Sequence, residues 1–205
     1  MLRNNLARLM VDRGIKTLHL SNETGIARST ITKIANNQSD KIGIDTINKL
    51  LGALDVGPSD FFDYIPYDFD FTFDIDFEDT SQIQEIPEEG WQWGIFPAYA
   101  FLNVHRNGTK IKTIEYYGSF DEEPVHNGYD MDLKPHIELK LSKDVKDYSG
   151  NIKFLATVPV QFQTDIKNIL ENKITEYCSA NNYLVPDIQI EIFPLIRDWK
   201  AEQAF

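Results

Sequence analysis

A short segment near the start of the chain, residues 28–36, combines polar and cationic side chains at helical spacing. Ile31 and Ile34 would face a core, and the opposite face would carry Arg28, Ser29, Thr32, Lys33 and Asn36. Near the start of a helix, the planar guanidinium group of Arg28 can donate to both acceptors of a guanine. Ser29 and Thr32 can form single hydrogen bonds with base edges or touch a thymine methyl group. These residue types favour the reading of DNA sequence.

Lysine side chains in and around this segment are suited to contact the phosphates of DNA. Lys33, Lys41 and Lys49 are point charges on flexible stems. Residues 1–54 carry eight basic and four acidic residues. The resulting charge of +4 predicts few released counterions and a shallow salt dependence for one copy, which dimerisation would double. The alternative is a protein-docking module whose polar face is only solvated.

The histidine and cysteine residues of the chain do not occur at the spacings of known metal-binding or catalytic motifs. His19, His105, His126 and His136 belong to no H-E-x-x-H or Cys/His zinc pattern, so metal ligation is the lesser interpretation for each. Cys178 lies on an apolar stripe, which favours a core position over a nucleophile. The chain contains no G-x-S-x-G, Walker or G-x-G-x-x-G motif. We therefore expect no enzyme, no catalytic residue, no metal and no cofactor.

One strongly acidic segment, Asp68–Glu78, alternates apolar and polar residues without exception. This period of two predicts a strand with an aromatic face and an acidic face. The acidic face would carry Asp68, Asp70, Asp74, Asp76 and Glu78. Three interpretations stay open. The acidic face could be a solvated face that protects a sheet edge. Its charge could instead compete with DNA for the basic residues 1–54 or attract a partner, or its carboxylates could bind a divalent cation.

Aromatic residues cluster just after Gly90. The cluster consists of Trp91, Trp93, Phe96, Tyr99 and Phe101. Large aromatic side chains dominate buried cores, so we expect most of them inside. A ligand pocket or a dimer surface is the alternative, because Trp and Tyr also dominate interfaces.

The elements that must position the DNA-reading residues are five short helices over residues 1–65. Thr17 can cap the second helix, and Gly25 supplies the positive φ for a sharp turn before the third. Pro58 opens the fifth. The first helix would bury Leu2, Leu6, Leu9 and Met10 and end at Gly14, and the fourth would bury Ile44, Ile47, Leu50, Leu51 and Leu54. These residues suffice for a small all-α core.

The pattern of these helices resembles a known family. The resemblance rests on the pattern Leu20-Ser21-x3-Gly25-Ile26-x4-Ile31, on the fourth helix that follows it, and on the ending from Leu54 to Phe62. With these features, the helices resemble the Xre family of Cro/CI-like helix-turn-helix regulators. The resemblance covers the first third of the chain. It implies a five-helix DNA-binding domain whose third helix enters the major groove.

Residue roles follow from the resemblance by position. It implies that Arg28, Ser29, Thr32 and Lys33 face bases and that Thr17 and Asn36 hold phosphates, together with Lys41 and Lys49 from the charge argument. Two positions depart from the family pattern. Ala27 stands where a capping Ser or Thr is usual, and Thr17 stands where a phosphate-binding Gln is common.

Residues 66–205 have a different character and resemble no family. Strands are predicted at 68–78, at 100–104 and 111–114 around the turn pair Asn107-Gly108, at 136–141, at 152–157 and at 188–192; one long helix is predicted from Phe162 to Cys178. Runs of strands with one helix predict an α+β domain with an antiparallel sheet. The composition also changes here, because no Lys or Arg occurs from Leu50 to His105, and proline marks a boundary at Ile65-Pro66.

The composition of the whole chain limits the classes of protein that it can be. It has 205 residues, 42% hydrophobic and 25% charged, with a net charge of −12 and one cysteine. No apolar run of membrane-spanning length and no secretory signal is present, so we expect a cytoplasmic protein without disulfides.

Taken together, these features predict a transcriptional regulator of two domains, 1–65 and 66–205. The first would bind double-stranded DNA sequence-specifically, and the second would serve dimerisation or signal reception. We expect a repressor of prophage or mobile-element type, acting as a homodimer. The alternative is an antitoxin or antirepressor whose acidic C-terminal domain neutralises a basic protein partner and whose N-terminal domain only autoregulates.

Overall fold

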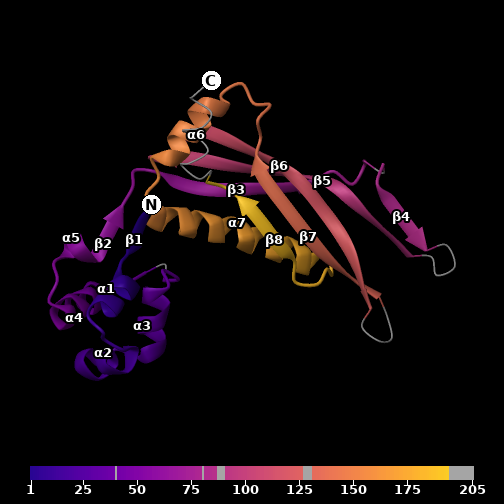
Figure 1. Cartoon of the computed structure of the whole chain (residues 1–205). Helices are drawn as coiled ribbons and strands as arrows, with labels where there is room; N and C mark the ends of the chain where they lie inside the picture. Colours follow the sequence, from indigo (N-terminus) through magenta and orange to yellow (C-terminus); the bar gives the residue numbers. More distant parts are fainter. Residues whose placement is uncertain (40, 80, 87–90, 127–130, 194–205) are drawn as a thin grey trace. The chain divides into compact units, whose positions relative to one another are not determined.

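The computed structural model in Figure 1 describes residues 1–39, 41–79, 81–86, 91–126 and 131–193. The chain divides into two compact units, Met1–Pro66 and Tyr67–Phe205. Each unit is built around secondary structure of its own, and each is described separately below. Among the described residues, no helix combines the length and the apolar character needed to cross a bilayer.

The N-terminal unit combines short helices with a small strand pair. Its elements are β1 (Leu2–Asn4), α1 (Leu6–Asp12), α2 (Thr17–Thr24), α3 (Arg28–Ala35), α4 (Ile44–Leu54), α5 (Pro58–Phe61) and β2 (Phe62–Tyr64). The prediction of an all-α domain is wrong here, because β1 and β2 pair in an antiparallel ladder that joins Leu2 to Tyr64. Leu2 therefore lies outside the first helix and is 62% exposed.

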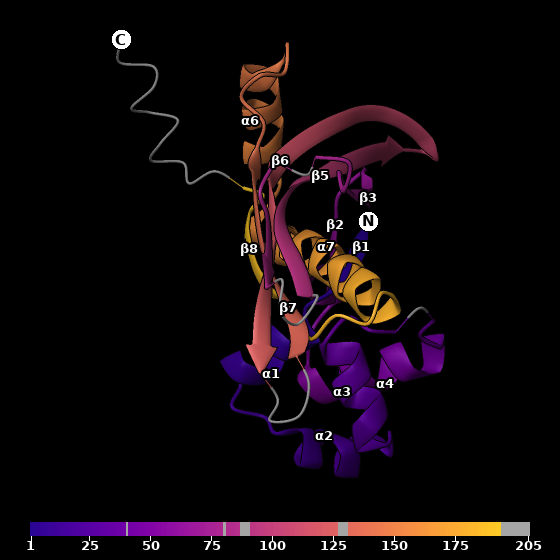
Figure 2. The ribbon, with the colours of Figure 1, turned by 90° about the vertical axis from the view of Figure 1, so that its right-hand side faces the viewer.

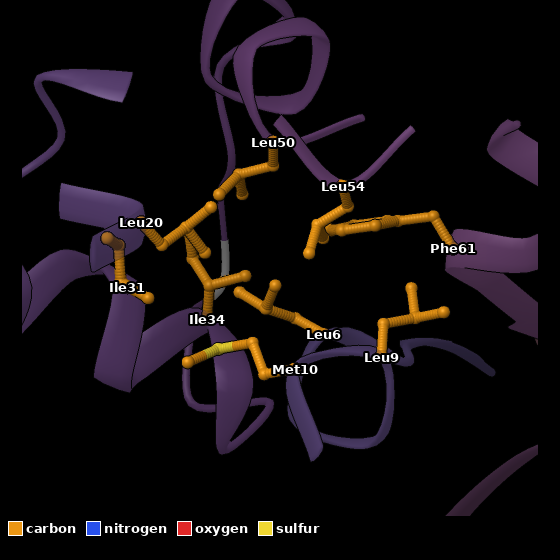
Figure 3. Packing of buried hydrophobic residues seen from close by; sticks show 9 residues of the cluster. All are labelled: Leu6, Leu9, Met10, Leu20, Ile31, Ile34, Leu50, Leu54 and Phe61. Carbon is orange, nitrogen blue, oxygen red and sulfur yellow. The ribbon is translucent and has the colours of Figure 1, made fainter. Parts of the chain in front are cut away.

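The core of this unit comes from apolar residues of α1–α5. Figure 3 shows nine of them in contact: Leu6, Leu9, Met10, Leu20, Ile31, Ile34, Leu50, Leu54 and Phe61. All nine are at most 9% exposed. Ile44, predicted to be buried, is 76% exposed, because it is the first residue of α4 and precedes the part of the helix that faces the core.

Residues with positive φ end the helices and turn the chain. Gly14 follows α1, and its amide donates to Val11 O while the Ile15 amide donates to Met10 O. Gly25 ends α2 at φ 71°, as the sequence predicts. Asn37, at φ 55°, does the same after α3. Asn is one of the few side chains that accept this left-handed conformation, which satisfies the last carbonyls of a helix.

The C-terminal unit is a mixed sheet with helices. Its strands are β3 (Asp68–Ile75), β4 (Ile83–Ile86), β5 (Trp91–Arg106), β6 (Thr109–His126), β7 (Met131–Leu141) and β8 (Asp187–Glu191). Over the described residues the order is β3-β5-β6-β7-β8, with β4 pairing with β5. The prediction of a purely antiparallel sheet is wrong, because β8 runs parallel to β7. That orientation follows from the two helices that separate β7 from β8 and return the chain to the same end of the sheet.

Two helices, rather than the one predicted, lie between β7 and β8. They are α6 (Tyr148–Ala156) and α7 (Val160–Ala180). Residues 152–157, predicted as a strand, form the second half of α6 and the residue after it, because Ile152 and Leu155 meet the core at a helical spacing of three. The long helix is confirmed as α7, whose buried stripe is Phe162, Ile166, Leu170, Ile174 and Cys178.

The sheet has one face toward α7 and one face away from it. Figure 2 shows α7 along one face of the sheet. On this face the rings of Phe73 on β3 and Tyr177 on α7 have centroids 5.7 Å apart. Along β5, Ala98, Ala100 and Leu102 are fully buried, whereas the residues between them are partly exposed. The hairpin predicted at Asn107-Gly108 is confirmed, with φ 53° and 76° at these two residues and Arg106 opposite Thr109.

Candidate nucleic-acid interface

Helix α3 presents the predicted base-reading residues on one surface. Arg28, Ser29, Thr32 and Lys33 are all exposed, while Ile31 and Ile34 on the other side are 0% and 1% exposed. The four residues span little more than a third of the helix circumference, so one groove of a nucleic acid could meet all of them. Among the described residues, neither Arg28 nor Lys33 forms an ion pair, which leaves both cations free for a ligand.

The turn between α2 and α3 holds this helix in a fixed direction. Gly25 reverses the chain, the Ser21 hydroxyl donates to Ile26 O at 2.7 Å, and the Thr24 hydroxyl donates to Leu20 O at 2.6 Å. The Ile26 amide donates in turn to the Thr24 hydroxyl at 3.2 Å. The roles of Ser21 and Thr24 as turn locks were not predicted. Their polar side chains beside Gly25 are the signal in the sequence.

Hydrogen bonds between Asn4, Ile34 and Asn37 fix the C-terminal end of α3. The buried Asn4 side chain of β1 donates to Ile34 O at 2.7 Å and to Asn37 Oδ1 at 2.8 Å, and its backbone amide donates to the same Asn37 oxygen at 2.8 Å. Asn37 Nδ2 returns a hydrogen bond to Asn4 O at 3.1 Å. This Asn4–Asn37 clamp joins the first strand to the end of α3. The sequence does not reveal it, because the two residues are 33 positions apart.

Two of the predicted phosphate-binding residues lie beside the exposed face of α3. Thr17 and Asn36 line one shallow depression of about 540 Å³, together with Lys16 and Thr32. The prediction that Thr17 caps α2 is wrong, because Lys16 occupies the cap position and Thr17 is the first helical residue. The hydroxyl of Thr17 therefore makes no cap hydrogen bond and lines the depression instead.

The other two predicted phosphate contacts lie elsewhere. Lys41 is exposed in the segment between α3 and α4. Lys49, on α4, is half-exposed and pairs with Asp45 one turn earlier, at 2.8 Å. Neither lysine lines the depression. Ala27 precedes α3 without a side-chain hydrogen bond to its first turn, as its departure from the family pattern implies.

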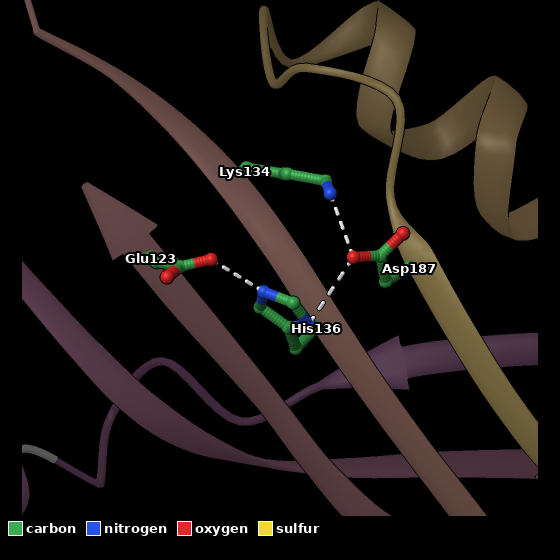
Figure 4. Close-up of polar contacts among 4 residues, drawn as sticks. All are labelled: Glu123, Lys134, His136 and Asp187. Carbon is green, nitrogen blue, oxygen red and sulfur yellow. Dashed lines mark hydrogen bonds and ion pairs between the residues drawn. The ribbon is translucent and has the colours of Figure 1, made fainter. Parts of the chain in front are cut away.

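Titratable groups of the C-terminal unit form ion pairs on the sheet surface. Figure 4 shows His136 between Glu123 at 2.6 Å and Asp187 at 3.5 Å, with Lys134 also 2.6 Å from Asp187. Over the described residues, no three His, Cys, Asp or Glu side chains converge as metal ligands would.

Cys178 is fully buried on α7, as its place on the apolar stripe predicts. Burial raises the pKa of its thiol to about 11. The thiol therefore stays protonated near neutral pH, and a protonated buried thiol is a poor nucleophile.

The N-terminal unit has the arrangement typical of helix-turn-helix domains, in which a tight turn joins two helices and the second of them exposes a cationic face. The family model for the Cro/C1-type helix-turn-helix DNA-binding domain matches residues 5–67. The N-terminal third of the chain is therefore a Cro/C1-type helix-turn-helix domain, and the rest of the chain remains unassigned to a family.

A solved structure described as a candidate DNA-binding protein from Bacteroides fragilis is 21% identical to this chain. The match covers 31% of this chain and 100% of that one, with a TM-score of 0.29. No curated protein matches the chain.

Proposed function

We propose that this protein is a sequence-specific DNA-binding transcriptional regulator, a repressor of prophage or mobile-element type. The observation that carries the proposal is the exposed cationic face of α3 within a Cro/C1-type helix-turn-helix domain, where Arg28 and Lys33 have no ion-pair partner among the described residues. The two ends of this helix are held by the α2–α3 turn and by the Asn4–Asn37 clamp. Preorganisation of this kind lowers the entropic cost of binding.

In this proposal, α3 enters the major groove with its first turn toward the bases. Arg28, Ser29, Thr32 and Lys33 read base edges. Thr17 and Asn36 bind the adjacent phosphate through the depression that they share, and Lys41 and Lys49 add phosphate contacts. Because Asp45 already pairs with Lys49, the contribution of Lys49 is the smaller of the two lysines.

The regulator acts as a dimer in the cytoplasm, with the C-terminal unit as its dimerising or signal-receiving part. Two copies of α3 would then occupy half-sites about one helical turn of DNA apart. Occupation of such a site blocks the access of RNA polymerase. Repression by occlusion needs no catalytic residue and no cofactor.

Selection of bound sites from random double-stranded DNA by the full-length protein tests this function. We expect enrichment of a two-part motif with related halves. The variant Arg28→Ala/Lys33→Ala should lose the enrichment, and the control Arg8→Ala/Arg13→Ala, which removes two exposed cations outside α3, should keep it. Failure of the parent protein to enrich any motif would refute sequence-specific binding.

A second function is favoured by the charge of residues 67–205, which contain 25 acidic and 12 basic residues. An antitoxin or antirepressor would use this acidic unit to neutralise a basic protein, and its helix-turn-helix domain would only regulate its own gene. Affinity capture with the full-length protein distinguishes the two functions. One basic protein bound in fixed stoichiometry would favour the second function.

A further inference from the structure

The sheet face that points away from α7 carries aromatic side chains that remain accessible. On β5, Tyr99 and Phe101 alternate with the fully buried Ala98, Ala100 and Leu102, and they point to the opposite face because successive strand residues do so. Tyr117 on β6 is opposite Tyr99, with ring centroids 5.5 Å apart, and is 53% exposed. We refer to Tyr99, Phe101 and Tyr117 as the aromatic strip.

Two acidic side chains border the aromatic strip, and one lysine, Lys140 of β7, is directly opposite Tyr117 and pairs with Glu138 at 3.6 Å. Asp74 of β3 is directly opposite Tyr99, and Glu115 of β6 is directly opposite Phe101. Both carboxylates are exposed. Within the described part of the chain neither has an ion-pair partner, whereas Asp147 and Asp187 are each paired with a lysine at 2.7 and 2.6 Å. Unpaired negative charge is thus placed beside accessible rings.

Arginine is the residue type that can bind both to the accessible aromatic rings and to the neighbouring carboxylates. Its guanidinium group stacks on the faces of tyrosine and phenylalanine rings, and its planar set of donors matches a carboxylate. A surface with several arginines could therefore place them over the rings while pairing with Asp74 and Glu115. Tyrosine and arginine are also the residue types that contribute most to protein–protein binding.

We propose that the aromatic strip, with Asp74 and Glu115, binds an arginine-rich segment of another protein. The same face of a second copy does not fit, because it would bring Asp74 and Glu115 of one copy toward those of the other, so the dimer proposed above would use another surface. The proposal deepens the second of the two functions above by assigning a surface to the basic partner. It does not depend on DNA binding.

Titration of a fluorescent peptide of alternating arginine and leucine with the full-length protein tests this surface. We expect saturable binding to one site. A peptide with glutamate in place of arginine should not bind. The peptide with lysine in place of arginine has the same charge but stacks less well, and it should bind more weakly.

Two pairs of matched variants locate the site. Asp74→Asn/Glu115→Gln should weaken peptide binding about fivefold, and Asp144→Asn/Glu176→Gln, which neutralises two exposed acids elsewhere on the unit, should change it little. Tyr117→Ala should weaken binding about tenfold, whereas Val160→Ala, a truncation at a residue that is 72% exposed on α7, should not. Unchanged thermal melting would show that each variant is folded.

Several results would overturn the proposal. Equal losses in the two double variants would mean general attraction of a cation to an acidic protein. Self-association that Tyr117→Ala abolishes would assign the strip to a second copy. Absence of peptide binding, combined with tighter DNA binding by Asp74→Asn/Glu115→Gln, would assign it to the chain's own N-terminal unit. Capture of a basic protein that Tyr117→Ala binds equally well would leave the second function standing but remove this surface from it.

Discussion

Arg28 is the residue on which sequence discrimination should depend most. It is exposed on the first turn of α3 and has no ion-pair partner among the described residues, so its guanidinium group is free to meet a guanine. Arg28→Ala should cost about 1–3 kcal/mol at the preferred site and relax the preference at one base pair. Lys49→Ala should weaken binding to all sequences alike, and only slightly, because Asp45 shares its charge. Competition binding with single-base variants of the site measures both effects, and equal, sequence-independent losses would contradict a base-reading role for Arg28.

Asn4 should matter for α3 although it lies outside the exposed face. Asn4→Ala would remove the side-chain donor to Ile34 O and Asn37 Oδ1, which keep only backbone donors, and the acceptor of the buried Leu6 amide, at a cost of about 1–3 kcal/mol. Hydrogen exchange at the amides of the last turn of α3 should accelerate in the full-length variant. Asn22→Ala, at an exposed position of α2, is the control and should leave these amides protected. Equal exchange in the two variants would show that the clamp does not hold the helix.

Asp70 of β3 is in contact with two side chains of the neighbouring strand β5. The Asn103 side chain donates to it at 2.9 Å and His105 lies 2.7 Å away, and these contacts lower the pKa of Asp70. A lowered pKa means that the contacts stabilise the folded protein above the usual pKa of aspartate and that this contribution is lost as the pH falls through the lowered value. Asn103→Ala should raise the pKa of Asp70 toward its usual value, as an NMR titration of the carboxyl carbon would show. An unmoved titration would remove Asn103 as the main cause.

Elements with an unbroken pattern were predictable from the sequence. Alternation predicts β3, although the strand ends at Ile75 and not at Glu78. The Asn-Gly pair predicts the β5–β6 turn, and apolar residues at helical spacing from Phe162 to Cys178 predict α7. Prediction failed where the deciding contacts are remote. Residues 2–4 become a strand only because residues 62–64 pair with them, and the short apolar run at 152–157 fits helix and strand equally until its packing is known.

The same distinction holds for the candidate site. The exposed face of α3 follows from helical spacing within nine residues, so Arg28, Ser29, Thr32 and Lys33 could be named from the sequence. The depression that gathers Thr17 with Asn36 could be named only through a family resemblance, since its walls come from three helices. The Asn4–Asn37 clamp has no local pattern at all.

Gly118 should determine whether β6 and β7 can pair. A Cβ atom at this position would lie 1.7 Å from Glu138 O, a backbone atom that cannot move without breaking the ladder. Gly118→Ala should therefore destabilise the C-terminal unit by about 1–3 kcal/mol or more. Ser119→Ala, the next residue on the same strand, should be nearly neutral. Calorimetry of the full-length protein would show a lower transition for the C-terminal unit only, and an unchanged transition would contradict the close approach of the strands.

At the scale of the whole molecule, the C-terminal unit should be needed for tight DNA binding. Residues 1–66 have their own core and should fold alone. One copy of this unit has few cations and a small contact surface, so it should bind the selected site far more weakly than the full-length protein and with a shallower salt dependence. Binding isotherms at several salt concentrations measure both quantities. If the isolated unit binds as tightly as the whole protein, the C-terminal unit is not the dimerising part.

The acidic strand gives the last test, because its charge could act on DNA without touching it. Asp70 and Asp74 lie on one face of β3, and Asp76 follows the strand, which ends at Ile75. Replacing all three by Asn should raise DNA affinity if this charge competes with DNA for the N-terminal unit. The rise should be largest at low salt, because the screening length is about 30 Å at 0.01 M and about 10 Å at 0.1 M.

The control for this triple variant must remove the same net charge elsewhere in the unit. Asp144→Asn, Asp147→Asn and Asp187→Asn do so, although Asp147 and Asp187 also lose their lysine partners. If the charge of the strand itself matters, only the first triple should bind DNA more tightly. Equal gains would mean that DNA responds to the net charge of the chain and that the strand is a solvated edge, whose acids keep other strands from pairing with it.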